Sequence, residues 1–193
     1  MNLYKFGKNV VKASLTPIYR VRIIGKENIP KEGGVLICSN HIDNLDPPVV
    51  GMTATRDIHF MAKEELFRLP LLKEILPRVN AFPVKRGMSD REALRKGLSL
   101  LKEGRVLGLF PEGTRSKNGE LGEGLAGAGF FALRSKAAIV PCAIIGPYKL
   151  FGRLKVVYGK PIDFNKYREQ KTSADEATGI IMEEIRKLIA EHK

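Results

Sequence analysis

A histidine followed by two aspartates is the part of this chain best suited to proton transfer. His41 stands two residues before Asp43 and five before Asp46, within the polar segment 40–48. A carboxylate that binds one imidazole nitrogen fixes the tautomer in which the other nitrogen can take a proton. Either aspartate could thus orient His41 as a general base, without a nucleophilic serine. The alternative is a surface loop in which the aspartates only cap turns and the following helix.

The residues before His41 indicate where it stands in the fold. Residues 35–38 read Val-Leu-Ile-Cys, an apolar run that predicts a buried strand, and the Asn, Asp and Pro residues that follow cannot continue it. In an open α/β sheet, ligands bind beyond the carboxyl ends of the strands. We therefore expect His41 at that edge.

Two further strands run into turns suited to anion binding. A strand at 80–84 leads to Lys85 and Arg86, and a strand at 105–110 leads to the turn 111–116. A guanidinium presents a planar fork of donors to a phosphate, and the N–H groups of a glycine-containing turn can converge on an anion. The candidate residues are Arg86, Glu112, Gly113, Thr114 and Arg115. The alternatives are that Lys85 and Arg86 are merely solvated and that Glu112 pairs with Arg115 at the surface.

The remaining segments alternate between strand and helix patterns. Further strands are expected at 19–24, 59–62, 138–145 and 155–158, and helices at 47–55, 63–78, 89–103, 127–136 and from 173 onward. Pro70 and Pro77 should interrupt the second helical stretch. Ser89 with Glu92 and Ser173 with Glu176 have the spacing of a capping box, so a helix is expected to start at each pair. Pro141 suggests a bulge or an edge strand. This alternation predicts a single α/β domain with a largely parallel central sheet flanked by helices.

The first residues have the periodicity of an amphipathic helix, assigned to 1–18, ahead of an α/β domain at 19–193. One sector of this helix is apolar and the opposite side is basic: Leu3, Phe6, Val10 and Val11 against Lys5, Lys8 and Lys12. Such a helix can dock on the body of the domain or lie in an anionic membrane interface.

Composition narrows the class of partner. The 193 residues are 44% hydrophobic, which suits one domain with a substantial core, and a net charge of +12 attracts polyanions. Nucleic acid is not expected, since aromatic residues are only 7% and no nucleic-acid-binding motif is present. An anionic membrane surface is favoured instead. Because no apolar run reaches the roughly 18 residues of a membrane span, we expect a cytoplasmic protein, peripheral on the inner face of the cell membrane.

The two cysteines carry no predicted chemistry. Cys38 and Cys142 each lie in an apolar run, so they are expected to be core residues in a reduced compartment. Neither a disulfide nor a metal site is predicted.

Four segments together resemble the glycerophospholipid acyltransferase family, typified by 1-acylglycerol-3-phosphate acyltransferases. They are 40–46 (Asn-His-Ile-Asp-Asn-Leu-Asp), 82–86 (Phe-Pro-Val-Lys-Arg), 110–116 (Phe-Pro-Glu-Gly-Thr-Arg-Ser) and 139–143 (Ile-Val-Pro-Cys-Ala). The resemblance covers roughly residues 20–160, and the third segment is the most specific. The chain departs from the family pattern before Gly127, where many relatives have a lysine and this chain has Leu125 and Ala126.

The resemblance implies a role for each of these residues. His41 would be the general base with Asp46 orienting it, Arg86 and Arg115 would hold a phosphate, and Pro141 would shape the site without taking part in the chemistry. Glu112, with Gly113 and Thr114 beside it, would help to bind the acceptor. Backbone N–H groups near the His41 loop are candidates for stabilising the oxyanion.

The implied reaction is direct transfer of a fatty acyl group to the sn-2 hydroxyl of a lysophospholipid acceptor, 1-acyl-glycerol-3-phosphate, which gives phosphatidic acid. Acyl-CoA or acyl carrier protein would be the co-substrate, with no metal and no other cofactor. The rival functions are a catalytically silent phospholipid-binding protein and an acyl thioesterase.

Overall fold

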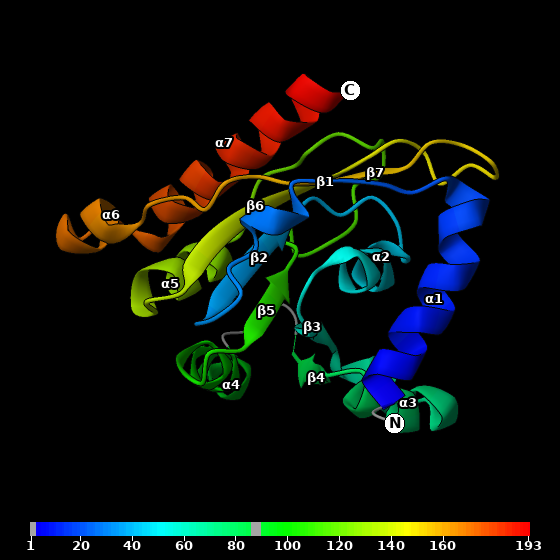
Figure 1. Ribbon diagram of the computed structural model, residues 1–193. Helices are drawn as coiled ribbons and strands as arrows, with labels where there is room; N and C mark the ends of the chain where they lie inside the picture. The colour runs from blue at the N-terminus through cyan, green and yellow to red at the C-terminus, as the bar shows by residue number, and fades with distance from the viewer. Residues whose placement is uncertain (1–2, 86–89) are drawn as a thin grey trace.

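The computed structural model of the chain describes residues 3–85 and 90–193 (Figure 1). Its strands are β1 (Arg22–Ile24), β2 (Val35–Ser39), β3 (Ile58–Lys63), β4 (Ala81–Val84), β5 (Val106–Leu109), β6 (Ala138–Ile145) and β7 (Lys155–Tyr158). Its α-helices are α1 (Leu3–Tyr19), α2 (Asp46–Thr53), α3 (Pro70–Arg78), α4 (Arg91–Lys102), α5 (Gly127–Arg134), α6 (Asn165–Glu169) and α7 (Ala174–His192). Two 3₁₀ turns, η1 (Lys26–Asn28) and η2 (Glu64–Arg68), complete the described elements.

The strands form one seven-stranded sheet in the order β1-β7-β6-β2-β5-β3-β4. Neighbours from β6 through β2, β5 and β3 to β4 are parallel, β7 is antiparallel to β6, and β1 is parallel to β7. The predicted single α/β domain with a largely parallel sheet and an N-terminal helix is confirmed.

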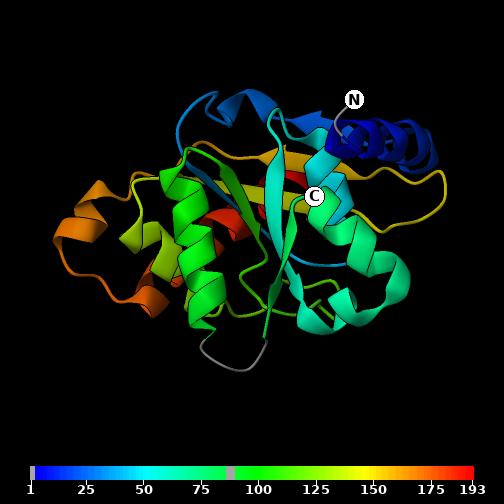
Figure 2. The ribbon, with the colours of Figure 1, turned by 90° about the horizontal axis from the view of Figure 1, so that it is seen from below.

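Helices cover both faces of the sheet, which is why the central strands are apolar on both sides. In β2, Val35 and Ile37 pack with residues of α1 and α2, whereas Leu36 and Cys38 pack with α4, α5 and α7. Figure 2 shows α4, α5 and α6 on one side of the strands and α1 and α3 on the other. Because five parallel strands end at one edge, the loops after β2 and β5 meet there.

Pro141 lies in a strand that is paired on both sides, so the predicted bulge or edge position is wrong. In the β6–β2 register it stands opposite Cys38, and its carbonyl accepts a hydrogen bond from Gly159 at 2.8 Å. A residue's N–H and C=O point to the same side of a strand, so the missing N–H of Pro141 faces Gly159, just beyond the end of β7. The ladder therefore loses little by having a proline there.

Helix starts follow side-chain capping. The capping box of Ser173 and Glu176 at α7 is confirmed. Helix α4 is capped instead by Asp90, whose side chain accepts hydrogen bonds from the backbone N–H groups of residues 92 and 93, and the expected cap Ser89 lies outside the described residues. Pro70 does begin a helix, but Pro77 lies inside the last turn of α3 and does not interrupt it.

Helix α1 packs against α2 with a different side from the one that its periodicity suggested. Tyr4 is buried, Val11 and Leu15 pack against the core, and the Nζ of Lys8 donates to the carbonyl of Ala54 at 2.7 Å. The other predicted apolar residues, Leu3, Phe6 and Val10, are 45%, 47% and 47% exposed. The helix thus docks on the domain and still presents an apolar strip outward.

Candidate active site

His41 lies just beyond the carboxyl end of β2 and pairs with Asp46, not with Asp43. Its Nδ1 is 2.7 Å from Oδ2 of Asp46, and the Asp46 side chain is fully buried. Asp43 is engaged locally, because its Oδ1 accepts a hydrogen bond from the backbone N–H of Leu45. Of the two aspartates, the structure therefore places Asp46 against the imidazole.

Four donors hold the carboxylate of Asp46 in one orientation. Oδ2 accepts from the backbone N–H groups of Ile42 at 2.6 Å and Asp43 at 2.7 Å as well as from the His41 ring. Oδ1 accepts from the hydroxyl of Tyr148 at 2.7 Å. Asp46 is also the first residue of α2, where the helix dipole favours a negative group.

The segment after β5 wraps around His41. The backbone N–H of His41 donates to Oε1 of Glu112 at 2.9 Å, and the N–H of Ser116 donates to the carbonyl of His41 at 2.7 Å. The ring of Phe110 stacks on the imidazole with centroids 4.3 Å apart. The histidine is thus fixed through its backbone, its Nδ1 and its ring face, and its residual exposure is 8%.

The second oxygen of Glu112 is also occupied. Oε2 accepts from the backbone N–H of Gly122 at 2.9 Å, so this carboxylate joins the His41 loop to the loop before α5. No ion pair forms between Glu112 and Arg115, both of which the structure describes. The alternative of a surface pair with Arg115 is therefore excluded, and Glu112 supports the backbone of His41.

The free side of the imidazole can take part in proton transfer. When Nδ1 donates to Asp46, Nε2 carries a lone pair, and no described residue supplies a hydrogen-bond partner for it. A hydroxyl placed at Nε2 could therefore give up its proton there, while Asp46 stabilises the resulting imidazolium.

An apolar cavity of about 700 Å³ borders this centre on the side of α4 and α5. Phe110 both lines the cavity and stacks on His41, and Gly113 and Thr114 form part of its rim. Most of the wall is hydrophobic, including Met61, Val84, Leu94, Leu109, Phe130 and Phe131. The polar side chains of Lys85 and Asp90 also line it.

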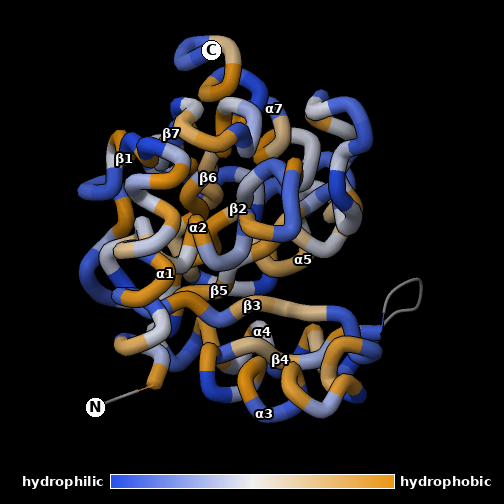
Figure 3. The backbone as a smooth tube through the Cα atoms, turned by 90° about the vertical axis from the view of Figure 1, so that its right-hand side faces the viewer, coloured by the Kyte–Doolittle hydropathy of each residue, from blue (hydrophilic) through white to orange (hydrophobic). Residues whose placement is uncertain are grey.

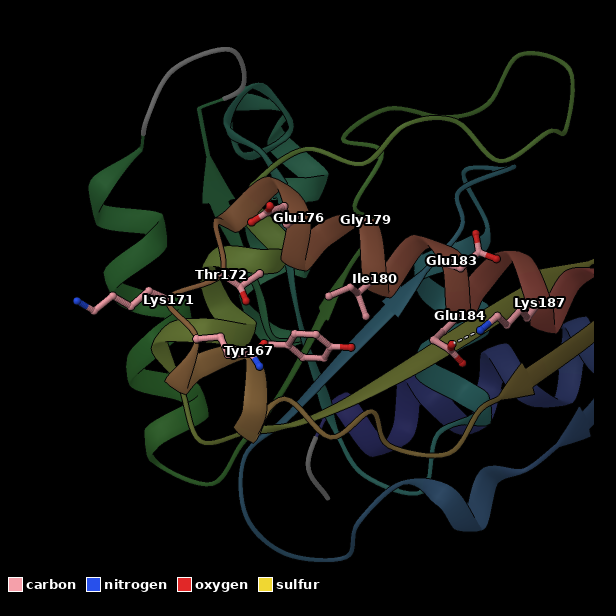
Figure 4. A pocket seen from close by; sticks show the side chains of 10 residues that line it. Tyr167, Lys171, Thr172, Glu176, Gly179, Ile180, Glu183, Glu184 and Lys187 are labelled. Carbon is pink, nitrogen blue, oxygen red and sulfur yellow. Dashed lines mark hydrogen bonds and ion pairs between the residues drawn. The ribbon is translucent and has the colours of Figure 1, made fainter.

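A second hollow lies between α6 and α7 (Figure 4). It shares no lining residue with the cavity beside His41. Several of its charged groups are already engaged: Lys187 donates to Glu184 at 2.7 Å, and Glu176 accepts from the backbone N–H of Ser173 at 2.9 Å. No described histidine or cysteine lines this hollow. The centre at His41 is the better candidate for chemistry.

Comparison with known proteins identifies the family of this chain. The Acyltransferase family model matches residues 20–145. The 1-acyl-sn-glycerol-3-phosphate acyltransferase of Bacillus subtilis is 35% identical over 167 residues, which cover 83% of this chain and 82% of that protein. The chain belongs to the acyltransferase family. It is therefore an acyltransferase enzyme.

Two further relatives of this acyltransferase differ from it in length. A chloroplastic 1-acyl-sn-glycerol-3-phosphate acyltransferase of Arabidopsis thaliana is 31% identical over 79% of this chain, which spans only 46% of that protein. The crystal structure of PlsC, the 1-acyl-sn-glycerophosphate acyltransferase of Thermotoga maritima, has a TM-score of 0.79 and 23% identity, covering 99% of this chain and 80% of the other. That likeness shows the shared fold.

The structure brings only some of the predicted site residues of the acyltransferase together. His41, Asp46 and Glu112 are bonded into one centre, with Gly113 and Thr114 on the neighbouring cavity rim. Arg115 is exposed and precedes Ser116, which binds His41 through its backbone, but it does not line the cavity. Pro141 lies within β6, and Arg86 lies outside the described residues.

Sequence reasoning missed two residues that hold this centre. The side-chain amide of Asn40 binds both the N–H and the C=O of Ile144, at 2.7 and 2.9 Å, and so ties the start of the His41 loop to β6. Tyr148 reaches Asp46 across 102 positions of sequence. The position of Asn40 next to His41 was a usable signal, whereas nothing in the local sequence marks Tyr148.

The backbone donors of the His41 loop are already used. The N–H groups of residues 41, 42 and 43 each bind a carboxylate, so the oxyanion donors expected near this loop are not these three. Within residues 3–85 and 90–193, no cluster of His, Cys, Asp and Glu has the arrangement of a metal site. Cys38 and Cys142 are free and buried, and burial raises the pKa of the Cys142 thiol to about 12.

Proposed function

We propose that this acyltransferase moves a fatty acyl group from acyl-CoA or acyl carrier protein to the sn-2 hydroxyl of 1-acyl-glycerol-3-phosphate, giving phosphatidic acid. The proposal is carried by the His41–Asp46 pair, whose Nε2 has no hydrogen-bond partner among the described residues and whose imidazole stacks on Phe110 in the wall of an apolar cavity. The names of the relatives from Bacillus subtilis and Arabidopsis thaliana support the same acceptor.

In the proposed mechanism His41 is the general base. Nε2 takes the proton of the acceptor hydroxyl as the oxygen attacks the thioester carbonyl carbon, because an alcohol is a poor nucleophile at neutral pH. The tetrahedral intermediate then expels the sulfur, which leaves as a thiol with the proton from the imidazolium. Asp46 stabilises the imidazolium between these two steps, and no covalent enzyme intermediate forms.

The apolar cavity suits a fatty acyl chain. Its walls come from β3, β4, β5, α4 and α5, and transfer of the chain from water to such a surface is favourable by about 0.8 kcal/mol per buried methylene. Phe110 lines this cavity and stacks on the imidazole of His41, with ring centroids 4.3 Å apart. A chain held in the cavity would therefore have its carboxyl end near His41.

The most informative experiment is an assay of the purified protein with labelled acyl-CoA and acyl carrier protein against a panel of lysophospholipids, with products identified by mass spectrometry. Phosphatidic acid from 1-acyl-glycerol-3-phosphate is the expected product. Free fatty acid without any acylated product would favour a thioesterase. Turnover only with an acceptor that lacks a terminal phosphate would refute the proposed acceptor.

Arg115 and Arg86 are proposed to hold the acceptor's phosphate. Arg115 follows the segment that binds His41 and forms no ion pair with any described residue, so its guanidinium is free for a ligand. We expect Arg115→Ala to raise KM for the phosphorylated acceptor by about tenfold, since a charge-assisted hydrogen bond is lost, and to change KM for the acyl donor little.

The matched control for this prediction is Arg95→Ala, which removes the same charge from the exposed side of α4. It should leave both KM values unchanged. Equal effects of the two substitutions, or equal effects of Arg115→Ala on a phosphate-free acceptor analogue, would contradict a phosphate contact at Arg115.

We further propose that the protein binds the anionic, cytoplasmic face of the cell membrane through α1 and α3. Exposed apolar residues gather on these helices and on the loop beside the end of α1: Leu3, Phe6, Val10, Leu69, Leu71, Ile75, Leu150 and Phe151. Figure 3 shows this side of the molecule, with hydrophobic segments in both helices. None of the described helices is both long and apolar enough to cross a bilayer. An apolar strip on a protein of charge +12 suits an anionic lipid surface.

Binding to vesicles should depend on this strip. We expect Phe6→Ser with Val10→Ser to weaken sedimentation with phosphatidylglycerol vesicles by about tenfold or more, since two partly exposed apolar side chains no longer enter the interface. Binding of the unaltered protein should fall as salt rises. Asn9→Ser, exposed on the same helix, is the control and should bind as the unaltered protein does. Salt-independent binding, or equal binding by all variants, would refute the proposal.

A further inference from the structure

The loop between β6 and β7 brings a tyrosine hydroxyl to the carboxylate of Asp46. The hydroxyl of Tyr148 donates to Oδ1 of Asp46 at 2.7 Å. The three other donors to this carboxylate, from His41, Ile42 and Asp43, all bind Oδ2. Among the described residues, Tyr148 is thus the sole donor to Oδ1.

The tyrosine itself is held in place by helix α1. The ring of Tyr19, the last residue of α1, meets the Tyr148 ring edge-on, with centroids 5.3 Å apart and planes at 83°. The loop is joined to the same helix end by hydrogen bonds from the N–H of Phe151 to the carbonyl of Ile18, 2.7 Å, and from Leu154 to Tyr19, 3.0 Å. The hydroxyl therefore approaches Asp46 from a fixed direction.

The chemistry of this hydroxyl suits a permanent donor. Burial, and after it the negative charge of Asp46, raises the pKa of Tyr148 above its ordinary value. The hydroxyl consequently keeps its proton throughout the physiological range and always donates to the carboxylate.

We propose that Tyr148 is a positioning residue, which anchors Oδ1 and so fixes the plane of the Asp46 carboxylate while Oδ2 holds Nδ1 of His41. Without the hydroxyl, Oδ1 has no donor among the described residues, so the carboxylate is held through Oδ2 alone and can tilt, which loosens its hold on the imidazole. Because Tyr148 reaches the reaction only through Asp46, its loss affects turnover and not substrate binding. This inference rests on the proposed role of His41 as the general base.

The test is Tyr148→Phe, with Tyr158→Phe as the matched control. The Tyr158 hydroxyl is also buried and hydrogen-bonded, 2.7 Å from Thr53 and 3.1 Å from the carbonyl of Val50, but it does not touch His41 or Asp46. We expect kcat to fall about tenfold in Tyr148→Phe with both KM values unchanged, and to stay within about twofold in Tyr158→Phe. Equal kcat in the two variants would overturn the proposal.

A double variant separates a positioning role from loss of stability. If Tyr148 acts only through Asp46, then Tyr148→Phe should lower kcat no further in an Asp46→Ala background, which lacks the side chain that the tyrosine positions. Multiplication of the two effects would overturn the proposal, since it would mean that the tyrosine acts by another route.

NMR of the histidine imidazoles tests the same inference without an activity assay. The chain has three histidines, so the imidazole ¹⁵N signals of His41 can be assigned by substitution. We expect one tautomer, with the proton on Nδ1, in the unaltered protein and in Tyr158→Phe, and a mixture of tautomers in Tyr148→Phe. A Tyr148→Phe spectrum that matches the unaltered protein would refute the positioning role. Absence of acyl transfer in the unaltered protein would instead refute the proposed function.

Discussion

His41→Ala is expected to lower the rate of acyl transfer by about 10²- to 10⁴-fold, the range that general-base catalysis contributes. The substitution removes the lone pair of Nε2, and neither Asp46 nor Glu112 can replace it, because their oxygens are bound to backbone N–H groups and to Tyr148. The measurement is kcat with the labelled acyl donor and the phosphorylated acceptor. Binding to anionic vesicles should be nearly unchanged, since the apolar strip of α1 is untouched.

The control for this prediction is His59→Gln. His59 is near the start of β3, at the opposite edge of the sheet from the carboxyl ends, and its ring lies 3.3 Å from the carbonyl of Val106. Its substitution should leave kcat within a few fold. Unchanged turnover in His41→Ala would refute the assignment of the base. Loss of acyl transfer with continued release of free CoA would indicate that water still reaches the thioester when the acceptor is no longer activated.

The sequence predicted the elements that end in the site, because each depends on local pattern. Apolar runs bounded by polar turns located β2 and β5, and the order of the elements implied that their carboxyl ends share an edge. The choice between Asp43 and Asp46 could not be made locally, since both lie within reach in sequence. It is decided by the fold of the turn, in which the N–H groups of residues 42 and 43 point at Asp46.

Predictions that depended on packing were less accurate. Periodicity gives the angular positions of α1 residues but not which sector docks, and the docked side contains Lys8 because the Ala54 carbonyl is there to accept its hydrogen bond. The rule for proline in strands assumed a complete ladder beside Pro141, whereas β7 ends at that point. Glu112 was correctly singled out by type, but its bonds to the backbone of His41 and Gly122 depend on two loops that only the fold brings together.

Asp46→Asn is the second substitution from which we expect a large effect, a fall in kcat of about 10²- to 10⁴-fold. The position of Oδ2 accepts three hydrogen bonds, so in the variant only the amide oxygen fits there and the amide nitrogen must face Tyr148. The ring of His41 keeps its partner but loses the negative charge that stabilises the imidazolium during proton transfer. The fold should survive, since the side chain keeps its shape.

Asp43→Asn is the control that isolates this charge. It removes a carboxylate from the same loop. Among the residues that the structure describes, the Asp43 side chain accepts one hydrogen bond, from the N–H of Leu45 to Oδ1, and an amide oxygen can accept it as well. We expect kcat within a few fold of the unaltered protein, with KM for the acceptor little changed in both variants. Because the two substitutions alter net charge equally, comparable losses of turnover would mean that the loop needs negative charge in general, and the specific pairing of Asp46 with His41 would no longer explain catalysis.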